Sequence, residues 1–208
     1  MANLGIDTSD DVSSYLSCLA GQGVTFVARY LNPAGSTPVG LTNQEALNIS
    51  NTQVGSGYMS VVSLYEWGTT NYTVNYFTPA QGTTDAKNAY TRAQQIGMPT
   101  GVAPIYFCVD YDASSSDLSA INSYFEAINA YFDTFNPVPY GVGVYGSFLV
   151  VSSVYNSGWA SYAYQTYAWS NGQQFASNNL YQDQNGLNLC GFTNDGDLSY
   201  GDGGGWRI

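Results

Sequence analysis

Ala103-Pro-Ile-Tyr-Phe-Cys-Val-Asp-Tyr-Asp112 is an apolar run of strand length that ends in two carboxylates. Side chains two residues apart on a strand share a face, with Cα atoms roughly 6.5 Å apart, so we expect Asp110 and Asp112 to lie side by side. Two such acids on a buried strand are costly unless they perform chemistry, bind a cation or meet a cationic partner. In parallel α/β proteins, sites lie at the C-terminal ends of strands. The run therefore predicts a carboxylate-based site.

Strand-like and helix-like periods alternate on both sides of this run, without a linker. We expect strands at residues 4–8, 25–31, 58–67, 103–110, 141–145, 162–169, 180–184 and 189–194. We expect helices at residues 11–20, from 42 onward, 84–96, 118–135 and 148–155. Eight strands with crossovers predict a single α/β domain over residues 1–208, a (β/α)8 TIM-type barrel. The thin connections in the last third predict that the barrel is reduced or irregular there.

The alternation of side chains within the strands supports a closed barrel. In the fourth strand, Ile105, Phe107 and Val109 would face the helices, whereas Tyr106, Cys108 and Asp110 would line the interior. The same alternation turns Asp7 inward on the first strand and Tyr145 inward on the fifth. Each inward set ends in a polar group at the C-terminal side of its strand. One site at that end of the barrel explains all three.

Composition excludes several classes of function. Fifteen acidic residues against four basic ones give a formal charge of −11, so nucleic acid and anionic membranes are improbable partners. No run approaches the ~20 apolar residues that span a bilayer. The chain contains no His, which excludes Ser-His-Asp and Cys-His catalysis and His metal sites. Any enzymatic chemistry must use carboxylates, Tyr, Ser or Cys, and we expect no cofactor.

The cysteines and a calcium-like loop give no metal prediction. Cys18, Cys108 and Cys190 lack zinc spacing and form no CxxC pair, so we expect packing residues, with one disulfide and an odd thiol as the alternative. The loop from Asp110 begins like an EF-hand but lacks Gly at its sixth position and an acid at its twelfth, which is Ile121. We therefore expect no bound metal.

The N-terminus and the surface composition bear on localisation. The chain enters a strand at once and shows no basic or apolar leader segment, so no signal peptide is expected in it. The Lys-poor composition, rich in Tyr, Asn and Ser, nevertheless favours an extracellular or cell-surface location. Either the protein leaves the cell by another route, or the chain is a mature form with a starting Met.

Carboxylates at strand ends favour glycoside cleavage, which needs one protonated carboxyl group and a second that acts as nucleophile, base or stabiliser. Crowded acids raise one another's pKa and supply the protonated member. The catalytic candidates are Asp7, Glu66, Asp110, Asp112 and Asp197, with Asp195 as an alternative to the last. The candidates for substrate binding are Arg29, Tyr65, Tyr145, Trp169 and Gln182, and Trp67 and Tyr111 are further sugar-stacking candidates.

Several of these residues also have structural interpretations. Asp7 could cap the first helix, and Asp112 could belong to the N-cap region of the fourth. Arg29 could neutralise Asp7 or Glu66. The stretch Asn194-Asp-Gly-Asp197 is also a turn signature.

The motifs along the chain resemble those of a known family. They are Gly5-Ile-Asp-Thr-Ser9, Phe26-Val-Ala-Arg-Tyr-Leu31, Tyr65-Glu-Trp-Gly68, Ile105-Tyr-Phe-Cys-Val-Asp-Tyr-Asp112, Gly143-Val-Tyr-Gly-Ser147, Gln165-Thr-Tyr-Ala-Trp-Ser170 and Tyr181-Gln182. In this order, which covers nearly the whole chain, they resemble the DUF1906 family of glycoside hydrolase-like proteins. The resemblance implies a barrel related to the family 25 lysozymes.

The resemblance also implies roles for individual acids. Family 25 lysozymes place an Asp on strand one, Asp-x-Glu on strand four and an Asp near strand eight. Asp7 and Asp110 match the first two positions, and Asp197, ahead of Asp195, matches the last. Asp112 stands where the catalytic Glu would be, one methylene shorter, and a misplacement of this order can cost on the order of a hundredfold in rate. Glu66 could supply the missing acid from strand three.

Two functions remain open. One is a glycoside hydrolase that cleaves peptidoglycan or a related amino-sugar polysaccharide. The other is a catalytically weak or inactive barrel that binds carbohydrate outside the cell or assembles with copies of itself, because interfaces are depleted in Lys and enriched in Tyr.

Overall fold

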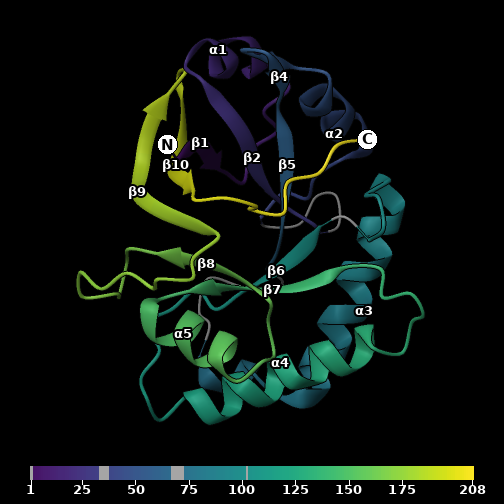
Figure 1. Ribbon diagram of the computed structural model, residues 1–208, viewed down its shortest axis with the longest axis vertical. Coiled ribbons are helices and arrows are strands. Elements are labelled where there is room, and N and C mark those ends of the chain that lie inside the picture. The colour runs from purple at the N-terminus through teal and green to yellow at the C-terminus, as the bar shows by residue number, and fades with distance from the viewer. Residues whose placement is uncertain (1, 33–37, 67–72, 102) are drawn as a thin grey trace.

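The computed structural model describes residues 2–32, 38–66, 73–101 and 103–208. Eight strands close into a barrel in the order β1-β10-β9-β8-β7-β6-β5-β2, which confirms the predicted fold (Figure 1). Their bounds are β1 Asn3–Asp7, β2 Val24–Tyr30, β5 Ser60–Tyr65, β6 Pro104–Cys108, β7 Gly141–Gly146, β8 Tyr162–Thr166, β9 Leu180–Leu189 and β10 Phe192–Ser199. A short hairpin, β3 (Gln53–Val54) and β4 (Gly57–Tyr58), precedes β5.

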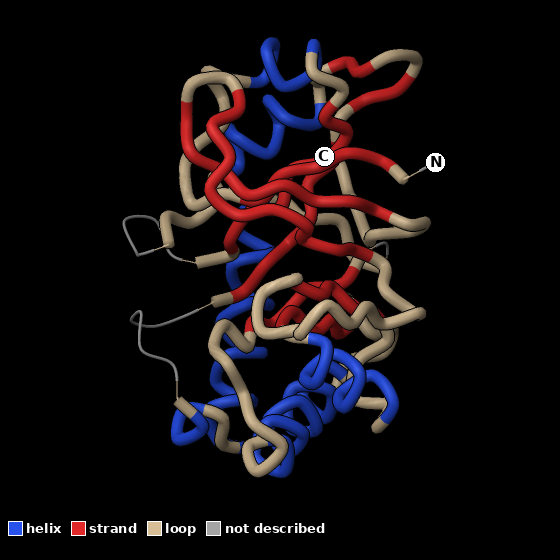
Figure 2. The backbone as a smooth tube through the Cα atoms, turned by 90° about the vertical axis from the view of Figure 1, so that its left-hand side faces the viewer, coloured by secondary structure: helices blue, strands red, loops and turns tan. Residues whose placement is uncertain are grey.

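The helices gather at two ends of the molecule. They are α1 (Leu16–Gly21), α2 (Asn43–Ser50), α3 (Pro79–Ile96), α4 (Leu118–Phe132) and α5 (Phe148–Asn156), with a 3-10 turn at Val74–Tyr76. The side view shows the strands between α1 and α2 at one end and α3, α4 and α5 at the other (Figure 2). None of the helices in the described residues is long and apolar enough to cross a membrane.

Side-chain caps explain where two of the helices begin. The hydroxyl of Thr42 accepts a hydrogen bond from the Glu45 backbone N–H, as the sequence pattern predicts. Thr78 does the same for Gln81, and Pro79 occupies the first turn of α3. The helix therefore begins at Pro79, earlier than the expected 84. It ends at Gly97, whose φ of 81° is the left-handed conformation that glycine favours.

The last two strands are where the barrel departs from a regular TIM architecture. Strand β10 runs antiparallel to both β9 and β1, whereas the other neighbours around the barrel are parallel. Our expectation of a strand at 189–194 is wrong, because Cys190 and Gly191, both with positive φ, form a tight hairpin turn inside that range. The chain then continues as β10 to Ser199, and no helix separates β8, β9 and β10.

The barrel interior is a packed core. As expected, Tyr106 and Cys108 face inward, while Ile105, Phe107 and Val109 pack toward the helices. A Cβ added at Gly143 would lie 2.5 Å from the Tyr106 ring, so only glycine leaves room for that ring. Asp7 on β1 and Tyr145 on β7 also face inward, so the parity expected for the first, fourth and fifth strands is confirmed.

The structure contradicts our preferred interpretation of the three cysteines as unpaired packing residues. Cys18 and Cys190 form a disulfide, with Cα atoms 5.9 Å apart, and Cys108 is a buried free thiol inside the barrel. The disulfide ties α1 to the β9–β10 turn. The sequence favours unpaired packing residues because the three cysteines lack zinc spacing and a CxxC pair, and a pair 172 residues apart leaves no such local signal.

Candidate functional site

A pocket of about 200 Å³ lies at the C-terminal ends of the parallel strands. All eight strands, or the residues directly after them, contribute to it. Its lining residues are Asp7, Tyr30, Glu66, Asp110, Tyr145, Thr166, Ala168, Trp169, Gln182, Asn185 and Asp195. Six of our candidates therefore meet in one cavity, together with Asp195. Four carboxyl groups line it, and no Lys or Arg is among the described lining residues.

Gln182 holds two of these acids in place. Its Nε2 donates hydrogen bonds to Asp7 Oδ2 at 2.7 Å and to Asp195 Oδ2 at 3.1 Å. Its Oε1 accepts a hydrogen bond from the Tyr145 hydroxyl at 2.9 Å. Both amide hydrogens are used and the side chain is 2% exposed, so Gln182 positions the acids and is poorly placed to donate to substrate.

Asp7 is the most buried carboxyl group of the pocket. Burial raises its pKa to about 7, and the negative charge of Asp195 adds to this effect. Hydrogen bonds from Gln182 and Tyr164 act in the opposite direction. Asp7 lies directly opposite Asp195 in the β1–β10 register, which explains why the two charges interact. Asp7 lines the pocket and caps no helix, since the N-cap position of α1 is Tyr15.

Glu66 follows the last residue of β5 and is partly buried at the pocket wall. Burial raises its pKa to about 8, and the charges of Asp110 and Asp7 contribute further. A carboxyl group with this pKa carries its proton at neutral pH. Glu66 thus has the property that a general acid requires.

Asp110 and Asp195 complete the acidic wall. The pKa of Asp110 is raised because the pocket walls exclude part of its water and because Asp195 is near, although its side chain remains open to solvent. Burial also raises the pKa of Asp195, against a hydrogen bond that its Oδ1 accepts from the Gly186 N–H at 2.7 Å. In the described part of the chain, these acids are not grouped so as to hold a metal ion.

Asp197 lies one layer below the pocket. It pairs with Gly5 in the register where Asp195 pairs with Asp7, and its side chain is fully buried. Its Oδ1 accepts a hydrogen bond from the Tyr164 hydroxyl at 2.5 Å. We expected Asp197, ahead of Asp195, to match the last acid of the related lysozymes. Of the two, Asp195 is the one that lines the pocket.

Asp112 does not join the site. Strand β6 ends at Cys108, so the alternation that would place Asp112 beside Asp110 no longer applies. Asp112 is exposed in the following loop and does not line the pocket, and the N-cap position of α4 is Asp117. The expectation of a paired wall of Asp110 and Asp112 is therefore wrong.

Some of the aromatic candidates line the pocket and others do not. Tyr145 and Trp169 line the pocket, and Trp169 is 40% exposed with a left-handed φ of 54°. Tyr65 faces away from the pocket, because it packs toward the helices against the Phe107 ring at 5.6 Å. Tyr111 stacks on Phe77, with ring centroids 5.8 Å apart. Trp67 lies outside the described residues.

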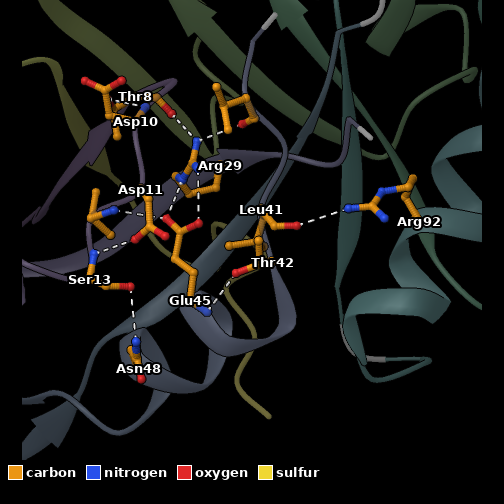
Figure 3. A network of polar contacts seen from close by, with 12 residues as sticks. Thr8, Asp10, Asp11, Ser13, Arg29, Leu41, Thr42, Glu45, Asn48 and Arg92 are labelled. Carbon is orange, nitrogen blue, oxygen red and sulfur yellow. Dashed lines mark hydrogen bonds and ion pairs between the residues drawn. The ribbon is translucent and has the colours of Figure 1, made fainter. Parts of the chain in front are cut away.

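Arg29 points away from the barrel interior, so neither expected role is supported. Its Nε and Nη2 bind the two oxygens of Glu45 on α2 at 2.7 and 3.1 Å, and both side chains are buried (Figure 3). Its Nη1 donates to the Thr8 carbonyl at 2.8 Å. Glu45 also accepts a hydrogen bond from the Val12 N–H. The pair therefore fixes the loop that follows Asp7, but it neutralises neither Asp7 nor Glu66.

Sequence reasoning missed three polar lining residues. Tyr30 and Thr166 are the last residues of β2 and β8, where strand parity could have found them. Asn185 lies beyond the expected end of its strand, which in the structure continues to Leu189.

Comparison with known proteins follows this geometry. The sequence model of the Rv2525c-like, glycoside hydrolase-like domain matches residues 17–197, which confirms the resemblance found in the motifs. Two curated Bacillus subtilis (strain 168) proteins, YbfG and FadG, both uncharacterized, are 34% identical over 95 residues and 37% identical over 113 residues. The matches cover 46% and 54% of this chain, but only 13% and 18% of those longer proteins.

Solved structures show the same fold. The Tat-secreted protein Rv2525c of Mycobacterium tuberculosis, crystallised with L-tartrate, superposes with a TM-score of 0.82 at 19% identity, and the match covers 99% of each chain. A B. stearothermophilus protein superposes with a TM-score of 0.66, also at 19% identity, over 96% of this chain and 97% of its own.

Proposed function

We propose that this chain, which belongs to the Rv2525c-like, glycoside hydrolase-like family, hydrolyses an amino-sugar polysaccharide such as peptidoglycan at the acidic pocket. One observation carries the proposal. Glu66 has a pKa of about 8 and Asp7, in the same pocket, has a pKa of about 7, so a proton donor and an ionised carboxylate coexist near neutral pH. Glycoside cleavage without His requires such a pair.

Each acid takes a role from its position. Glu66 would donate its proton to the leaving glycosidic oxygen. Asp110, which lines the pocket and is exposed to solvent, would act as the nucleophile, base or electrostatic stabiliser. Asp7 and Asp195, held by Gln182, would stabilise the positive charge that develops on the sugar in the transition state.

The pocket walls suggest what it receives. Its volume of about 200 Å³ is below the roughly 300–1,000 Å³ of typical small-molecule sites, so it fits one unit of a chain better than several. Trp169, partly exposed at the wall, offers an apolar face for a sugar ring. Four carboxyl groups favour a neutral or cationic sugar over an anionic one.

We also place this activity outside the cytoplasm. The Cys18–Cys190 disulfide supports this, because disulfides persist in oxidising compartments. The structural neighbour Rv2525c is a Tat-secreted protein, which agrees with such a location.

Release of new reducing ends from purified peptidoglycan and from chitin oligomers tests the proposal. Glu66→Gln and Asp110→Asn should each lower the rate by about 10²–10⁴-fold, the usual contribution of a general acid or base. Asp112→Asn is the matched control, since Asp112 lies outside the pocket, and it should retain the wild-type rate. Equal rates for wild type and the two pocket variants would refute the hydrolase. Oligomer binding without cleavage by wild type would favour a binding barrel.

A further inference from the structure

Beneath the pocket, one hydroxyl group contacts two carboxyl groups. The Tyr164 oxygen lies 2.5 Å from Asp197 Oδ1 and 3.3 Å from Asp7 Oδ2. The three side chains come from β8, β10 and β1, and all are nine-tenths or more buried. Asp7 lines the pocket, whereas Tyr164 and Asp197 lie in the barrel interior.

The number of protons constrains this arrangement. A tyrosine hydroxyl has one hydrogen, so it can donate to only one of the two carboxylates at a time. The second contact is favourable only if that carboxyl group is itself protonated and donates to the phenol oxygen. Two ionised aspartates would leave one of these contacts as oxygen facing oxygen. The geometry therefore calls for one proton held between Asp7 and Asp197.

A second observation concerns the far oxygen of Asp197. Its Oδ2 is buried and makes no hydrogen bond to any described residue. A buried ionised carboxylate with an unsatisfied oxygen is costly, and a proton on that carboxyl group removes the charge. Asp197 is thus suited to hold the shared proton while Asp7, which also accepts a hydrogen bond from Gln182, is ionised.

We propose that Asp7, Tyr164 and Asp197 form a proton relay that connects the pocket to a proton store inside the barrel. The shift moves two protons together. The Asp197 proton passes to the Tyr164 oxygen, and the Tyr164 hydroxyl proton passes to Asp7. Asp197 becomes ionised, Asp7 becomes neutral, Tyr164 is unchanged, and the pair keeps a total charge of −1. Tyr164 and Asp197 are positioning residues that set the charge of Asp7.

Other ionisable groups surround the relay, and the variants used to test it leave these side chains unsubstituted. Those facing Asp7 are Tyr30 on β2, Glu66 after β5, Cys108 on β6, Asp110 after β6, Tyr145 on β7 and Asp195 on β10. Those facing Asp197 besides the relay are Asp183 on β9 and Asp195. Burial, followed by the charge of Asp7, raises the pKa of Asp197 well above its usual range, which agrees with a stored proton.

Carboxyl ¹³C NMR across a pH titration tests the relay without requiring turnover. In the wild-type protein, the resonance of Asp197 should step over the same pH range as that of Asp7, because the remaining proton is shared when the first one leaves. In Tyr164→Phe, Asp197 should lose its step in this range. The Asp7 step should remain and move to higher pH, since its ionised form loses a hydrogen-bond donor.

Tyr106→Phe is the matched control. It removes a hydroxyl from another buried tyrosine of the barrel, which donates to the Gly203 carbonyl away from the acids, and both steps should persist. Asp197→Asn removes one resonance, which assigns it, and leaves Asp7 to titrate alone. A flat Asp197 resonance while Asp7 titrates in the wild type would overturn the relay, as would joint steps that survive in Tyr164→Phe. Either result can be read whether or not hydrolysis is detected.

Discussion

At the scale of single residues, two carboxyl groups of the pocket have different pKa values because their surroundings differ. Glu66 keeps its proton to about pH 8 and Asp7 to about pH 7, because both are buried among other acids. A pair of titratable groups with different pKa values is what identifies an acid and an ionised partner. Gln182 and Tyr164 supply the hydrogen bonds that favour the ionised form of Asp7.

The pH dependence of hydrolysis should follow these two groups. The rate should rise as Asp7 ionises near pH 7 and fall as Glu66 loses its proton near pH 8, giving a narrow maximum between them. A variant Glu66→Asp keeps an acid but shortens it, so it should lower the rate and retain both limbs. Initial rates from pH 5 to 10 measure this. A maximum near pH 5 would contradict the assignment.

The same burial should make the protein less stable at alkaline pH. The pKa of Asp7 is raised from 3.8 to about 7, so its folded form binds the proton more tightly than the unfolded chain. Stability from this group is complete below about pH 4 and is lost as the pH rises to about 7, at most about 4 kcal/mol for a shift of this size.

Asp7→Asn removes this penalty and should raise the free energy of unfolding at pH 8 relative to wild type. Urea unfolding at pH 5 and pH 8 measures it. Asp112→Asn is the control, because Asp112 is exposed. A stabilisation by Asp7→Asn that is no larger at pH 8 than at pH 5 would count against a raised pKa.

At the scale of secondary-structure elements, the hairpin β9–β10 brings Gln182 and Asp195 to the pocket. No helix lies between β9 and β10, and the Cys18–Cys190 disulfide links the turn of this hairpin to α1. The disulfide closes a loop of 172 residues and so restricts the unfolded chain. The chain entropy removed in this way should stabilise the folded state by up to about 5 kcal/mol.

Reduction should therefore lower the melting temperature of the protein and loosen this hairpin. Thermal unfolding with and without dithiothreitol measures the effect. Cys108→Ser should keep the sensitivity to reductant, since Cys108 is outside the disulfide, whereas Cys18→Ser should abolish it. An unchanged melting temperature of the wild type after complete reduction would contradict this prediction.

The buried ion pair Arg29–Glu45 is a second link between elements, and it joins β2 to α2 and to the loop after β1. Arg29→Met leaves the Glu45 charge buried without its partner, so it should destabilise the fold by about 3–5 kcal/mol. The double variant with Glu45→Met should recover part of this loss. Urea unfolding of the single and double variants checks the difference, and equal stabilities would show that Glu45 carries no buried charge.

Strand parity predicted much of the site, and its failures have physical causes. Asp7, Asp110 and Tyr145 were found because inward residues at strand ends must meet. Asp112 was misplaced because strand β6 ends two residues before Asp110, which no residue in the run signals.

Two other errors came from partners distant in the sequence. Arg29 pairs with a helix residue 16 positions away, and the disulfide spans 172. The barrel itself was predictable because strand-like and helix-like segments alternate along the chain and side-chain parity agrees in three of the strands.

At the scale of the whole molecule, the four basic residues all lie away from the pocket lining. Arg29 binds Glu45, Arg92 binds the carbonyls of Asn32 and Leu41, Arg207 lies over the Tyr58 ring, and Lys87 is exposed on α3. With a formal charge of −11, the molecule therefore presents an uncompensated acidic pocket.

This charge should select among saccharides. Oligomers of glucosamine, which carry ammonium groups, should bind more tightly than uronic-acid oligomers of equal length, and N-acetylated oligomers should fall between them. Calorimetric titration with Glu66→Gln, which slows turnover, measures the order. The preference should weaken with added salt. Equal or reversed affinities would contradict an electrostatic selection by the pocket.

Hydrolysis in ¹⁸O-labelled water is the most direct test of whether the acidic pocket is a glycosidase site. Mass spectrometry of an amino-sugar oligomer incubated with the wild-type protein at pH 7.5 should show one ¹⁸O at each new reducing end. Glu66→Gln should lower the amount of labelled product formed in a given time by about 10²–10⁴-fold, and Asp112→Asn should leave it unchanged. No labelled product from the wild type, or equal labelling with Glu66→Gln, would contradict the assignment of Glu66 as the proton donor.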